Sequence, residues 1–524
     1  MRKNGDIQRV PHKISFSSEK TLRLPFSAFD AINYNAHSEG GSFVGNDEPD
    51  KVTGWNARYL VRLFAFYLRG IVMDLLHTKI RTIYFRYLGA AFGSAMISSI
   101  YGIADMAMVG QYQGPDGAAA LAVVAPVWNL IYSLGLLAGI GGGVLFSVAK
   151  GCGGEGESNG NEYFTAAFIG TVIFSAVSWI AIVFFDRRML LLFGAEETLL
   201  PLARQYLQPI KFAVPLFVFN QMLAAFLRND GSPGLATAAV LFGGLFNVAG
   251  DYFFVFTCNM GIMGAGLATA IGAALTFAAM LCHFLSKNNT LRLVKPVKLT
   301  AKLRKIFVTG FSTFFIDAAM GILTVLFNRQ IMRYSGTEAL AVYGVVVNIS
   351  TIVQCCAYSI GQASQPIIST NFGAGRWGRI RATLRYALAT AALFSLAWTA
   401  AALTMPNGFI RIFMAPTAGV LAAAPYIIRC YGLSFLLLPF NIFSAYYFQS
   451  LMRPEISFFI SVSRGMVISG LLIYLLPAAA GAKALWFAMP VTELLVAAAA
   501  VYCMMRCTHN LYSRESRRHR ALRG

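Results

Sequence analysis

Apolar residues fall into long runs along this chain, and not into the alternating pattern of half-buried strands or the narrow stripes of soluble helices. Each run holds about 20 residues or more, the length that an α-helix needs to cross a hydrocarbon core about 30 Å thick. Gly, Pro and charged residues separate the runs. The pattern predicts an all-α membrane protein with twelve transmembrane helices, at 85–112, 118–148, 163–185, 204–228, 233–257, 263–286, 304–333, 338–369, 380–404, 421–450, 455–476 and 482–505.

Composition supports the membrane prediction and excludes several other classes. Of the 524 residues, 57% are hydrophobic and 13% are charged, whereas soluble domains carry about a quarter charged residues. A secreted disulfide scaffold, a nucleic-acid-binding domain and a cytosolic enzyme core are therefore excluded for most of the chain. Gly151-x-Gly153-x-x-Gly156 matches a dinucleotide fingerprint, but it follows a membrane span and not a strand, and no P-loop lysine motif occurs. We expect no nucleotide and no nucleic acid as partner.

The net charge of +20 predicts the orientation of the spans. The segment 287–305 and the tail after Met505 are rich in Lys and Arg, as is the segment 376–385. Such segments face the cytoplasm by the positive-inside rule, and an even number of spans places both termini on that side. We therefore expect a multi-pass protein of the plasma (inner) membrane with cytoplasmic termini. The predicted organisation is an extension over 1–84, an N-lobe over 85–286, a basic linker over 287–303, a C-lobe over 304–505 and a basic tail over 506–524.

The two sets of six spans repeat each other in sequence. A shift of 219 residues pairs 120–123 with 339–342, Asn129 with Asn348 and Gly142 with Gly361, and further along a shift of 221 pairs Asn220 with Asn441 and Pro233 with Pro454. Shared hydrophobicity does not explain aligned Asn and Pro residues. Units of six spans enter the membrane in the same orientation. Two like bundles around a central cavity suit alternating access, in which the lobes rock about a site near the midplane.

The N-terminal extension has two interpretations. Residues 1–54 are polar and mixed in charge, which predicts disorder. Residues 55–72 mix arginines with aromatic residues, which predicts an interfacial helix on the cytoplasmic face. The alternative is that translation starts at Met73, and the intact mass of the native protein distinguishes the two.

Several motifs in order resemble the multidrug and toxic compound extrusion (MATE) family of cation-coupled exporters, over about residues 80 to 506. They are IADMAMVGQYQG (103–114) followed by ALAVVAPV (120–127), the turn RNDGSP (228–233), GIMGAGLATA (261–270) and QPIISTNFGAGR (365–376). The first span lacks the proline that family members carry, and Gly89, Gly93 and Gly102 are the residues that could bend it. The resemblance implies export of organic compounds in exchange for a cation.

Acids within spans point to a coupling site, because a charge at the bilayer centre costs at least about 2.5 kcal/mol. The resemblance maps the family's N-lobe cation site onto Asp105, Asn247, Asp251 and Thr269. Asn247 and Asp251 are spaced i, i+4 and share one helix face. The internal repeat aligns these four residues with C-lobe residues that do not form a matching polar set. Oxygen ligands suit Na⁺, and two neighbouring carboxylates also favour H⁺. The coupling ion is therefore Na⁺ or H⁺, with no other cofactor or metal expected.

Other polar residues in the spans are candidates for the substrate cavity: Asn220, Gln221 and Asp317. Asn220 and Gln221 could equally bind neighbouring backbone. Glu493, a further acid within a span, is positioned to pair with Arg464. Met and aromatic residues predict a cavity that recognises shape and apolar surface more than a fixed ion pair.

Three functions follow from the pattern and the resemblance. The first is a monomeric secondary antiporter that exports organic, often cationic or amphipathic, compounds in exchange for Na⁺ or H⁺. The alternative is a lipid-linked oligosaccharide flippase of the related superfamily, which needs several basic cavity residues, whereas the basic residues within spans are chiefly Arg429 and Arg464. An intramembrane enzyme or scaffold is the remote alternative. An enzyme needs a second catalytic group beside a carboxylate, and the spans contain only one histidine, His283. The chain is therefore predicted not to be an enzyme.

Overall fold

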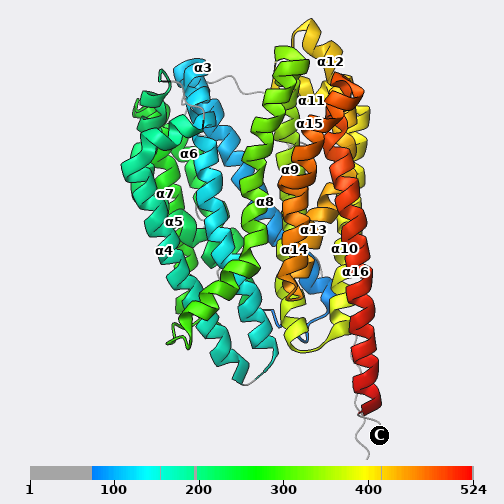
Figure 1. Cartoon of the computed structure of the whole chain (residues 1–524). Coiled ribbons are helices and arrows are strands. Elements are labelled where there is room, and N and C mark those ends of the chain that lie inside the picture. The colour runs from blue at the N-terminus through cyan, green and yellow to red at the C-terminus, as the bar shows by residue number, and fades with distance from the viewer. Residues whose placement is uncertain (1–72, 154, 194–196, 415, 522–524) are drawn as a thin grey trace, which may run out of the picture. The chain divides into compact units, whose positions relative to one another are not determined.

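The computed structural model describes residues 73–521 except 154, 194–196 and 415 (Figure 1). Its helices are α3 (Ile80–Gly151), α4 (Glu155–Leu192), α5 (Leu200–Asn229), α6 (Pro233–Asp251), α7 (Ile262–Leu281), α8 (Leu299–Tyr334), α9 (Gly336–Gly373), α10 (Trp377–Thr404), α11 (Pro406–Phe413), α12 (Ala418–Gly432), α13 (Leu438–Ser450), α14 (Pro454–Val462), α15 (Ile468–Ala480) and α16 (Ala488–Ala521). Among the described residues, twelve segments are long and apolar enough to cross a membrane. The predicted number of spans is confirmed, while the predictions for 1–72 lie outside the described residues.

Several spans begin or end beyond the apolar runs that predict them. The first begins at Ile80 and the seventh at Leu299, five residues before the predicted starts, and the third continues to Leu192. Basic residues such as Arg81 and Arg86 lie in the opening turns of the first span. Because long basic side chains can reach the headgroup layer from a helix end, the helix continues where the hydropathy signal stops.

The first two spans, Ile80–Gly114 and Asp116–Gly151, are two helices that meet at a sharp kink at Gly114 and share the label α3. Gly114 has φ 71°, in the left-handed region that glycine adopts without steric cost. It is the only residue of α3 with non-helical dihedral angles. The first span, which lacks a proline, is therefore helical without a break up to this turn.

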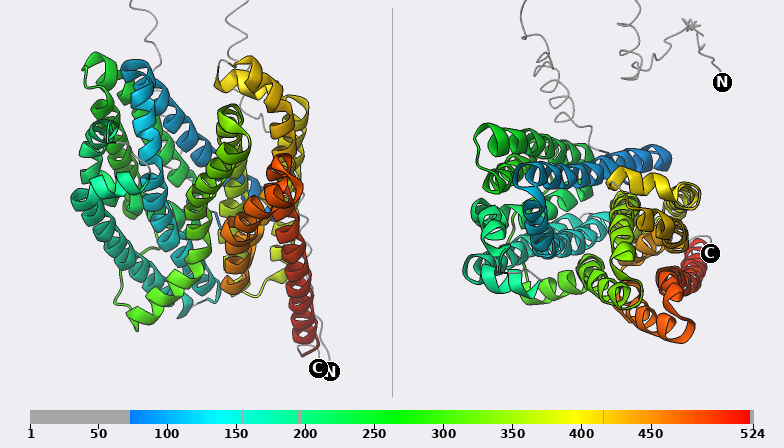
Figure 2. Two further views of the ribbon diagram at one scale, coloured as in Figure 1. Left: turned by 45° about the horizontal axis from the view of Figure 1, so that its top comes forward. Right: turned by 90° about the horizontal axis from the view of Figure 1, so that it is seen from above.

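The spans form two lobes whose internal contacts repeat. Seen from above, most helices of the first half gather on one side and most helices of the second half on the other, while the start of α3 reaches across to the second half (Figure 2). In the N-lobe, Asn220 Nδ2 donates to the carbonyl oxygen of Ala273 at 2.9 Å. In the C-lobe, Asn441 Nδ2 donates to the carbonyl oxygen of Glu493 at 2.8 Å. The two asparagines are 221 residues apart and the two acceptors 220, so the sequence repeat is also a structural one.

Each half begins with a segment that packs on the opposite lobe. Tyr84, at the start of α3, donates to Thr390 Oγ1 of α10 at 3.0 Å. The segment before α8 is held by α4 of the N-lobe, where Asn161 and Glu162 accept backbone hydrogen bonds from Arg292 and Val297 at 3.0 and 2.8 Å. The basic linker predicted over 287–303 is thus docked on the N-lobe, and its last residues belong to α8.

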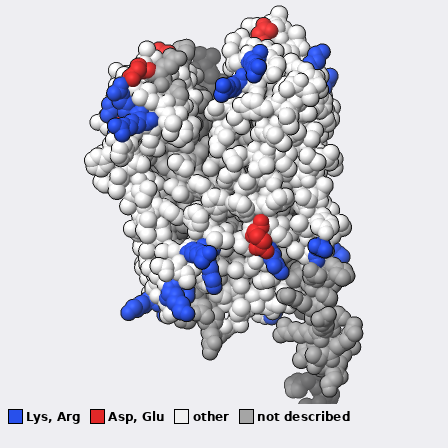
Figure 3. All heavy atoms as spheres, viewed as in Figure 1, with Lys and Arg blue, Asp and Glu red and all other residues white. Residues whose placement is uncertain are grey.

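The lobes meet closely at the end that carries the basic linker. A Cβ atom at Gly151 would overlap the carbonyl oxygen of Thr370, and one at Gly373 would overlap that of Val148. Asn229 at the end of α5 forms a pair of amide hydrogen bonds with Gln365 of α9, at 2.9 and 3.2 Å. Figure 3 shows Lys and Arg toward the two ends of the protein, and a hollow between the lobes at the upper end, opposite the linker.

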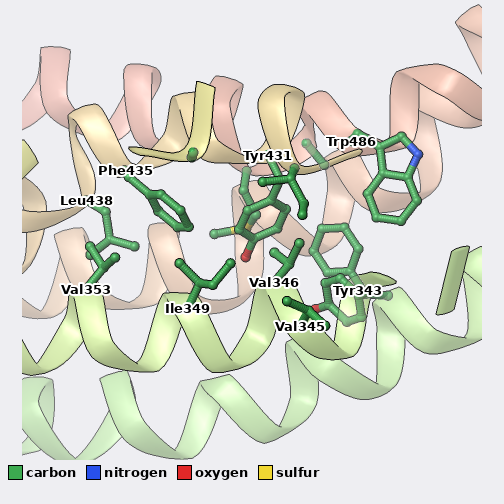
Figure 4. Close-up of a cluster of buried hydrophobic side chains, with 14 of the residues drawn as sticks. Tyr343, Val345, Val346, Ile349, Val353, Tyr431, Phe435, Leu438 and Trp486 are labelled. Carbon is green, nitrogen blue, oxygen red and sulfur yellow. The ribbon is translucent and has the colours of Figure 1, made fainter. Parts of the chain in front are cut away.

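Aromatic side chains pack together in the core of the C-lobe (Figure 4). Tyr343 of α9 stacks on Phe327 of α8, with ring centroids 5.0 Å apart, and Tyr431 of α12 and Trp486 lie against the same cluster. Because lipid is as apolar as these side chains, close packing supplies the stabilisation here instead of removal from water. This cluster joins α8, α9 and α12 within the C-lobe.

Candidate functional site

Tyr206 of α5 holds the first of the predicted coupling residues. The hydroxyl of Tyr206 donates to Asp105 Oδ2 at 2.8 Å, and Asp105 exposes 7% of its surface. Its second oxygen, Oδ1, is buried and makes no hydrogen bond to a described residue. Asp105 lies on the first span, so this contact ties that span to α5 and leaves one carboxylate oxygen free.

Close packing of α6 on α7 brings Asn247 and Thr269 together. Gly243 and Gly272 face each other so closely that a Cβ on either would overlap the other's carbonyl oxygen or a neighbouring side chain. Small residues at such positions allow two membrane helices to approach each other. Asn247 Nδ2 donates to Thr269 Oγ1 at 2.9 Å, while Asn247 Oδ1 is buried without a hydrogen bond to a described residue.

Asp251, one turn beyond Asn247 on α6, is the most isolated acid of the group. It is 0% exposed, and neither of its carboxylate oxygens accepts a hydrogen bond from a described residue. It interacts electrostatically with Asp105, and Tyr206 interacts with both acids and with Thr269. The structure therefore brings the four residues predicted for coupling into one buried group.

The free oxygens of this group fit a small cation. Asp105 and Asn247 each contribute one buried oxygen without a hydrogen bond, and Asp251 contributes two. Carboxylate and amide oxygens are ligands of hard cations, and a buried carboxylate without a partner also favours protonation. The donor set suits Na⁺ or H⁺ equally.

Tyr206 was not predicted from the sequence. It is an aromatic residue in an apolar run near Pro209, and such residues are usually packing or interfacial residues. Its position depends on Gly266 of α7, where a Cβ would overlap the carbonyl oxygen of Tyr206. The glycines of the segment 261–270 are a signal for a close helix contact, but the sequence does not identify the residue opposite.

The three cavity candidates lie in different surroundings. Asn220 is buried within the N-lobe, where its amide binds the backbone of Ala273, in agreement with the backbone-binding alternative. Gln221 packs against Gly135 of α3. Asp317 of α8 accepts a hydrogen bond from Tyr358 of α9 at 2.6 Å and interacts with Tyr132 of the N-lobe. Of the three, Asp317 is the one with a recorded electrostatic interaction with the other lobe.

Arg464 and Glu493 form a buried ion pair in the C-lobe, as the sequence predicts. Arg464 Nε lies 2.7 Å from Glu493 Oε1, and their side chains are 7% and 0% exposed. Asn441 donates to Glu493 Oε2 at 2.6 Å. The guanidinium and the carboxylate thus neutralise each other within the lobe.

Asp230 organises the end of the N-lobe that carries the linker. Lys150 Nζ lies 2.9 Å from Asp230 Oδ1, and His283 Nε2 lies 2.8 Å from Oδ2. Thr290 of the linker donates to the same carboxylate from its backbone nitrogen at 3.0 Å and from its hydroxyl. Burial raises the pKa of Asp230, but His283, Lys150 and Thr290 outweigh burial and hold this pKa below its usual value of 3.8.

This lowered pKa predicts how Asp230 contributes to stability. Because the pKa is lower in the folded state, the contribution is present above pH 3.8 and is lost as the pH falls through the folded pKa. We expect Asp230→Asn to lower the free energy of unfolding by about 1–3 kcal/mol at neutral pH, with a smaller difference below about pH 4. Thermal unfolding in detergent measures this. Asp74→Asn, at a side chain that is 55% exposed, is the control. A constant difference between wild type and Asp230→Asn from pH 7 to pH 3 would contradict the prediction.

Comparison with known proteins agrees with this fold of two six-span lobes. The MatE family model matches residues 90–253 and 308–475, more than half of the chain. The chain belongs to this family, and the resemblance found in its motifs is confirmed. It is therefore a multi-pass membrane protein of a transporter family.

Individual relatives point the same way. The multidrug export protein MepA of Staphylococcus aureus (strain MRSA252) is 23% identical over 410 residues, which cover 78% of this chain and 89% of that protein. MepA of Staphylococcus saprophyticus is 25% identical over 288 residues, which cover 53% of this chain and 61% of that protein. These relatives are transporters, so the prediction that the chain is not an enzyme is confirmed.

Solved structures match the fold. The outward-facing conformation of a multidrug resistance MATE family transporter of the MOP superfamily superposes with a TM-score of 0.77 and 19% identity, over 84% of this chain and 98% of that chain. A MOP superfamily transporter from Pyrococcus furiosus also gives a TM-score of 0.77, with 18% identity. At this identity the likeness concerns the fold alone.

Proposed function

We propose that this chain is a secondary antiporter that exports organic, often cationic or amphipathic, compounds in exchange for Na⁺ or H⁺. It acts as a monomer in the plasma (inner) membrane, with both termini in the cytoplasm. The observation that carries this proposal is the buried pair Asp105 and Asp251 with its free oxygens. The names of the relatives, which describe multidrug export, support the class of substrate.

Cation binding at this pair would be coupled to the position of the first span. Two buried carboxylates close together repel each other, and a bound Na⁺ or H⁺ reduces that repulsion. Asp105 lies on α3 and Asp251 on α6, so the cation favours arrangements that keep these helices together. A ligand shifts a conformational equilibrium by its difference in affinity for the two states. Cation binding thereby favours the state that releases substrate outward.

Alternating access requires the closed end of the lobes to open and close. We expect Gly151→Ala to hinder closure, because its Cβ would overlap the carbonyl oxygen of Thr370 in the other lobe. Overpacking costs about 1–3 kcal/mol, which lowers the closed population about fivefold or more relative to the open one. Ethidium transport by reconstituted protein should fall accordingly. Gly378→Ala is the matched control, since nothing lies within 4 Å of a Cβ there, and equal transport by both variants would contradict the prediction.

The flippase alternative finds less support in the described residues. Arg464 is paired with Glu493, and Arg429 donates to the carbonyl oxygen of Leu403 at 3.0 Å. Neither of these two arginines is a free cation that could bind a pyrophosphate, and Arg228 at the end of α5, which forms no ion pair with a described residue, is a single buried group. A lipid-linked oligosaccharide needs several such groups in the cavity, so the exporter remains the function that we propose.

Transport in proteoliposomes tests the proposed function. Purified protein is reconstituted, and uptake of ethidium is followed under an imposed Na⁺ gradient, an imposed H⁺ gradient or no gradient. We expect one of the two gradients to drive accumulation above the level of protein-free vesicles. If neither gradient drives movement of ethidium or of other organic cations, the exporter is excluded in favour of the flippase.

A further inference from the structure

Polar side chains follow one face of α5 in its first turns. Arg204, Gln208 and Lys211 are spaced i, i+4 and i+7 and so share that face. Arg204 and Gln208 are exposed, although α5 is one of the membrane spans. This start of α5 lies at the end of the N-lobe opposite the linker, because Asn229 at the other end of α5 lies where the lobes meet. Polar groups on the outside of a span need a polar partner or the headgroup layer.

A cavity of about 580 Å³ lies against this face, between α5 and the end of α4. Three of its lining side chains are cations, Arg187, Arg204 and Lys211, and one is an acid, Glu197. Arg187 Nη2 lies 2.8 Å from Glu197 Oε1. The buried carboxylate of Asp186 lies 3.0 Å from Arg204 Nε and 2.7 Å from Lys211 Nζ. Three cations therefore share two carboxylates, which leaves one positive charge in excess beside the cavity.

Two of these cations have donors to spare. Arg204 binds Asp186 through Nε, and its two terminal nitrogens make no hydrogen bond to a described residue. Lys211 uses Nζ for the same carboxylate and has two further donors. The side chain of Arg204 is 53% exposed. Because guanidinium and ammonium groups bind phosphate oxygens through such donors, the cavity suits an anionic phosphate group.

A second cavity, of about 480 Å³, continues from the first along α5. Gln208 lines both cavities. Beyond Gln208, the second cavity is a groove between α5 and α7 whose lining is apolar and includes Phe212, Leu216, Leu267 and Ala274. Phe212 is 82% exposed, and an exposed apolar side chain within a span contacts lipid. The cationic cavity at the start of the span therefore leads into an apolar groove nearer its middle.

We propose that the two cavities together bind an anionic phospholipid, with its phosphate at Arg204 and Lys211 and an acyl chain in the groove between α5 and α7. The excess positive charge matches the single negative charge of a phosphodiester. A phospholipid holds its headgroup at the membrane surface and its chains toward the middle, which is the order of the two cavities along α5. Basic pockets between membrane helices are typical sites for lipid headgroups. This site lies outside the coupling group and is independent of the proposed export function.

Native mass spectrometry of the purified full-length protein in a neutral detergent tests the site, because it resolves each bound lipid. The probes are dioleoyl phosphatidylglycerol, dioleoyl phosphatidylcholine with the same chains and a zwitterionic headgroup, and glycerol 3-phosphate without chains. We expect the first phosphatidylglycerol to bind about tenfold more tightly than the first phosphatidylcholine, since only the former brings a net charge. Glycerol 3-phosphate should not displace it. Equal affinity for the two lipids, or displacement by glycerol 3-phosphate, overturns the inference.

A pair of arginine variants separates the cavity from general surface charge. Arg204→Gln should weaken binding of phosphatidylglycerol about tenfold and leave phosphatidylcholine unchanged. Arg188→Gln is the matched control, since Arg188 is exposed and does not line the cavity. Thermal unfolding establishes that each variant is folded, and Arg187→Gln takes the place of an unfolded Arg204→Gln with the same expectation. Equal weakening by the cavity variant and by Arg188→Gln overturns the inference.

Filling the groove tests the position of the acyl chain. Ala274 is exposed and lines the groove, so the ring of Ala274→Phe occupies the groove without entering the core. We expect this variant to weaken binding of phosphatidylglycerol about fivefold or more, because the chain loses buried methylene groups. Ala397→Phe, at an exposed alanine of α10, is the control and should bind as wild type does. Wild-type affinity in a folded Ala274→Phe overturns the placement of the chain.

Discussion

Asp251→Asn and Asp105→Asn are each expected to reduce gradient-driven export to the level of protein-free vesicles. Each substitution removes one of two buried carboxylates that lie close enough to interact. An amide cannot be protonated at neutral pH and brings no negative charge to a bound Na⁺. Coupling therefore fails whichever of the two ions is used. Uptake of ethidium by proteoliposomes under both gradients measures the loss.

Two controls make this result specific to coupling. Folding should be intact, because replacing a buried, unpaired carboxylate with an amide removes a desolvation penalty. The midpoint temperature of thermal unfolding of each variant should therefore equal or exceed that of the wild type. Asp317→Asn should reduce transport less than either coupling-site substitution. It should instead change how transport depends on substrate concentration. Wild-type transport by both single variants at normal expression would contradict the assignment of the coupling site.

Glu493→Gln is expected to destabilise the C-lobe by about 3–5 kcal/mol, because it leaves the guanidinium of Arg464 buried without its counter-charge. The carboxylate is 0% exposed and 2.7 Å from Arg464 Nε. Thermal unfolding in detergent measures the change. Glu455→Gln is the matched control, since its pair with Arg453 is 3.6 Å long and more than half exposed. Exposed pairs contribute about 0–1 kcal/mol.

The double variant Arg464→Met with Glu493→Met distinguishes an ion-pair effect from a general packing defect. Replacement of both charges with apolar groups is often neutral, whereas removal of one is costly. The double variant should recover most of the stability lost by Glu493→Gln. A double variant less stable than Glu493→Gln would show that packing and hydrogen bonds, including the one from Asn441, dominate at this position.

Much of the architecture was predictable because its signals are local or periodic. Runs of apolar residues predicted all twelve spans, since a helix in lipid satisfies its own backbone hydrogen bonds. The repeat predicted two lobes, and the spacing of Asn247 and Asp251 placed them on one helix face. The cost of an acid within the membrane pointed to Asp105, Asp251, Asp317 and Glu493, and the family resemblance assigned the first two to the coupling site. These inferences needed no knowledge of contacts between distant segments.

Features that depend on such contacts were not predictable. Tyr206 joins the coupling group only because Gly266 allows α7 to approach α5. Asn229 and Gln365 are 136 residues apart, and neither residue alone indicates that the two amides pair across the lobes. Arg228 was seen only as part of a turn motif, because nothing local shows that the nearby acid is engaged elsewhere. The hydrophobic pattern of the sequence predicts the helices. Close packing between the helices determines which polar groups come into contact.

Reciprocal coupling of the two fluxes tests the antiporter most directly. When the binding of two ligands is coupled, each ligand affects the binding of the other. An imposed gradient of ethidium should therefore drive movement of the coupling ion, just as an ion gradient drives movement of ethidium. Proteoliposomes loaded with radioactive sodium, or with a pH-sensitive dye, report that ion flux when ethidium is added on one side. We predict an ethidium-dependent flux of Na⁺ or H⁺ in wild type and none in Asp251→Asn. Movement of ethidium in wild type without any flux of either ion, or an equal ion flux in Asp251→Asn, would contradict the account.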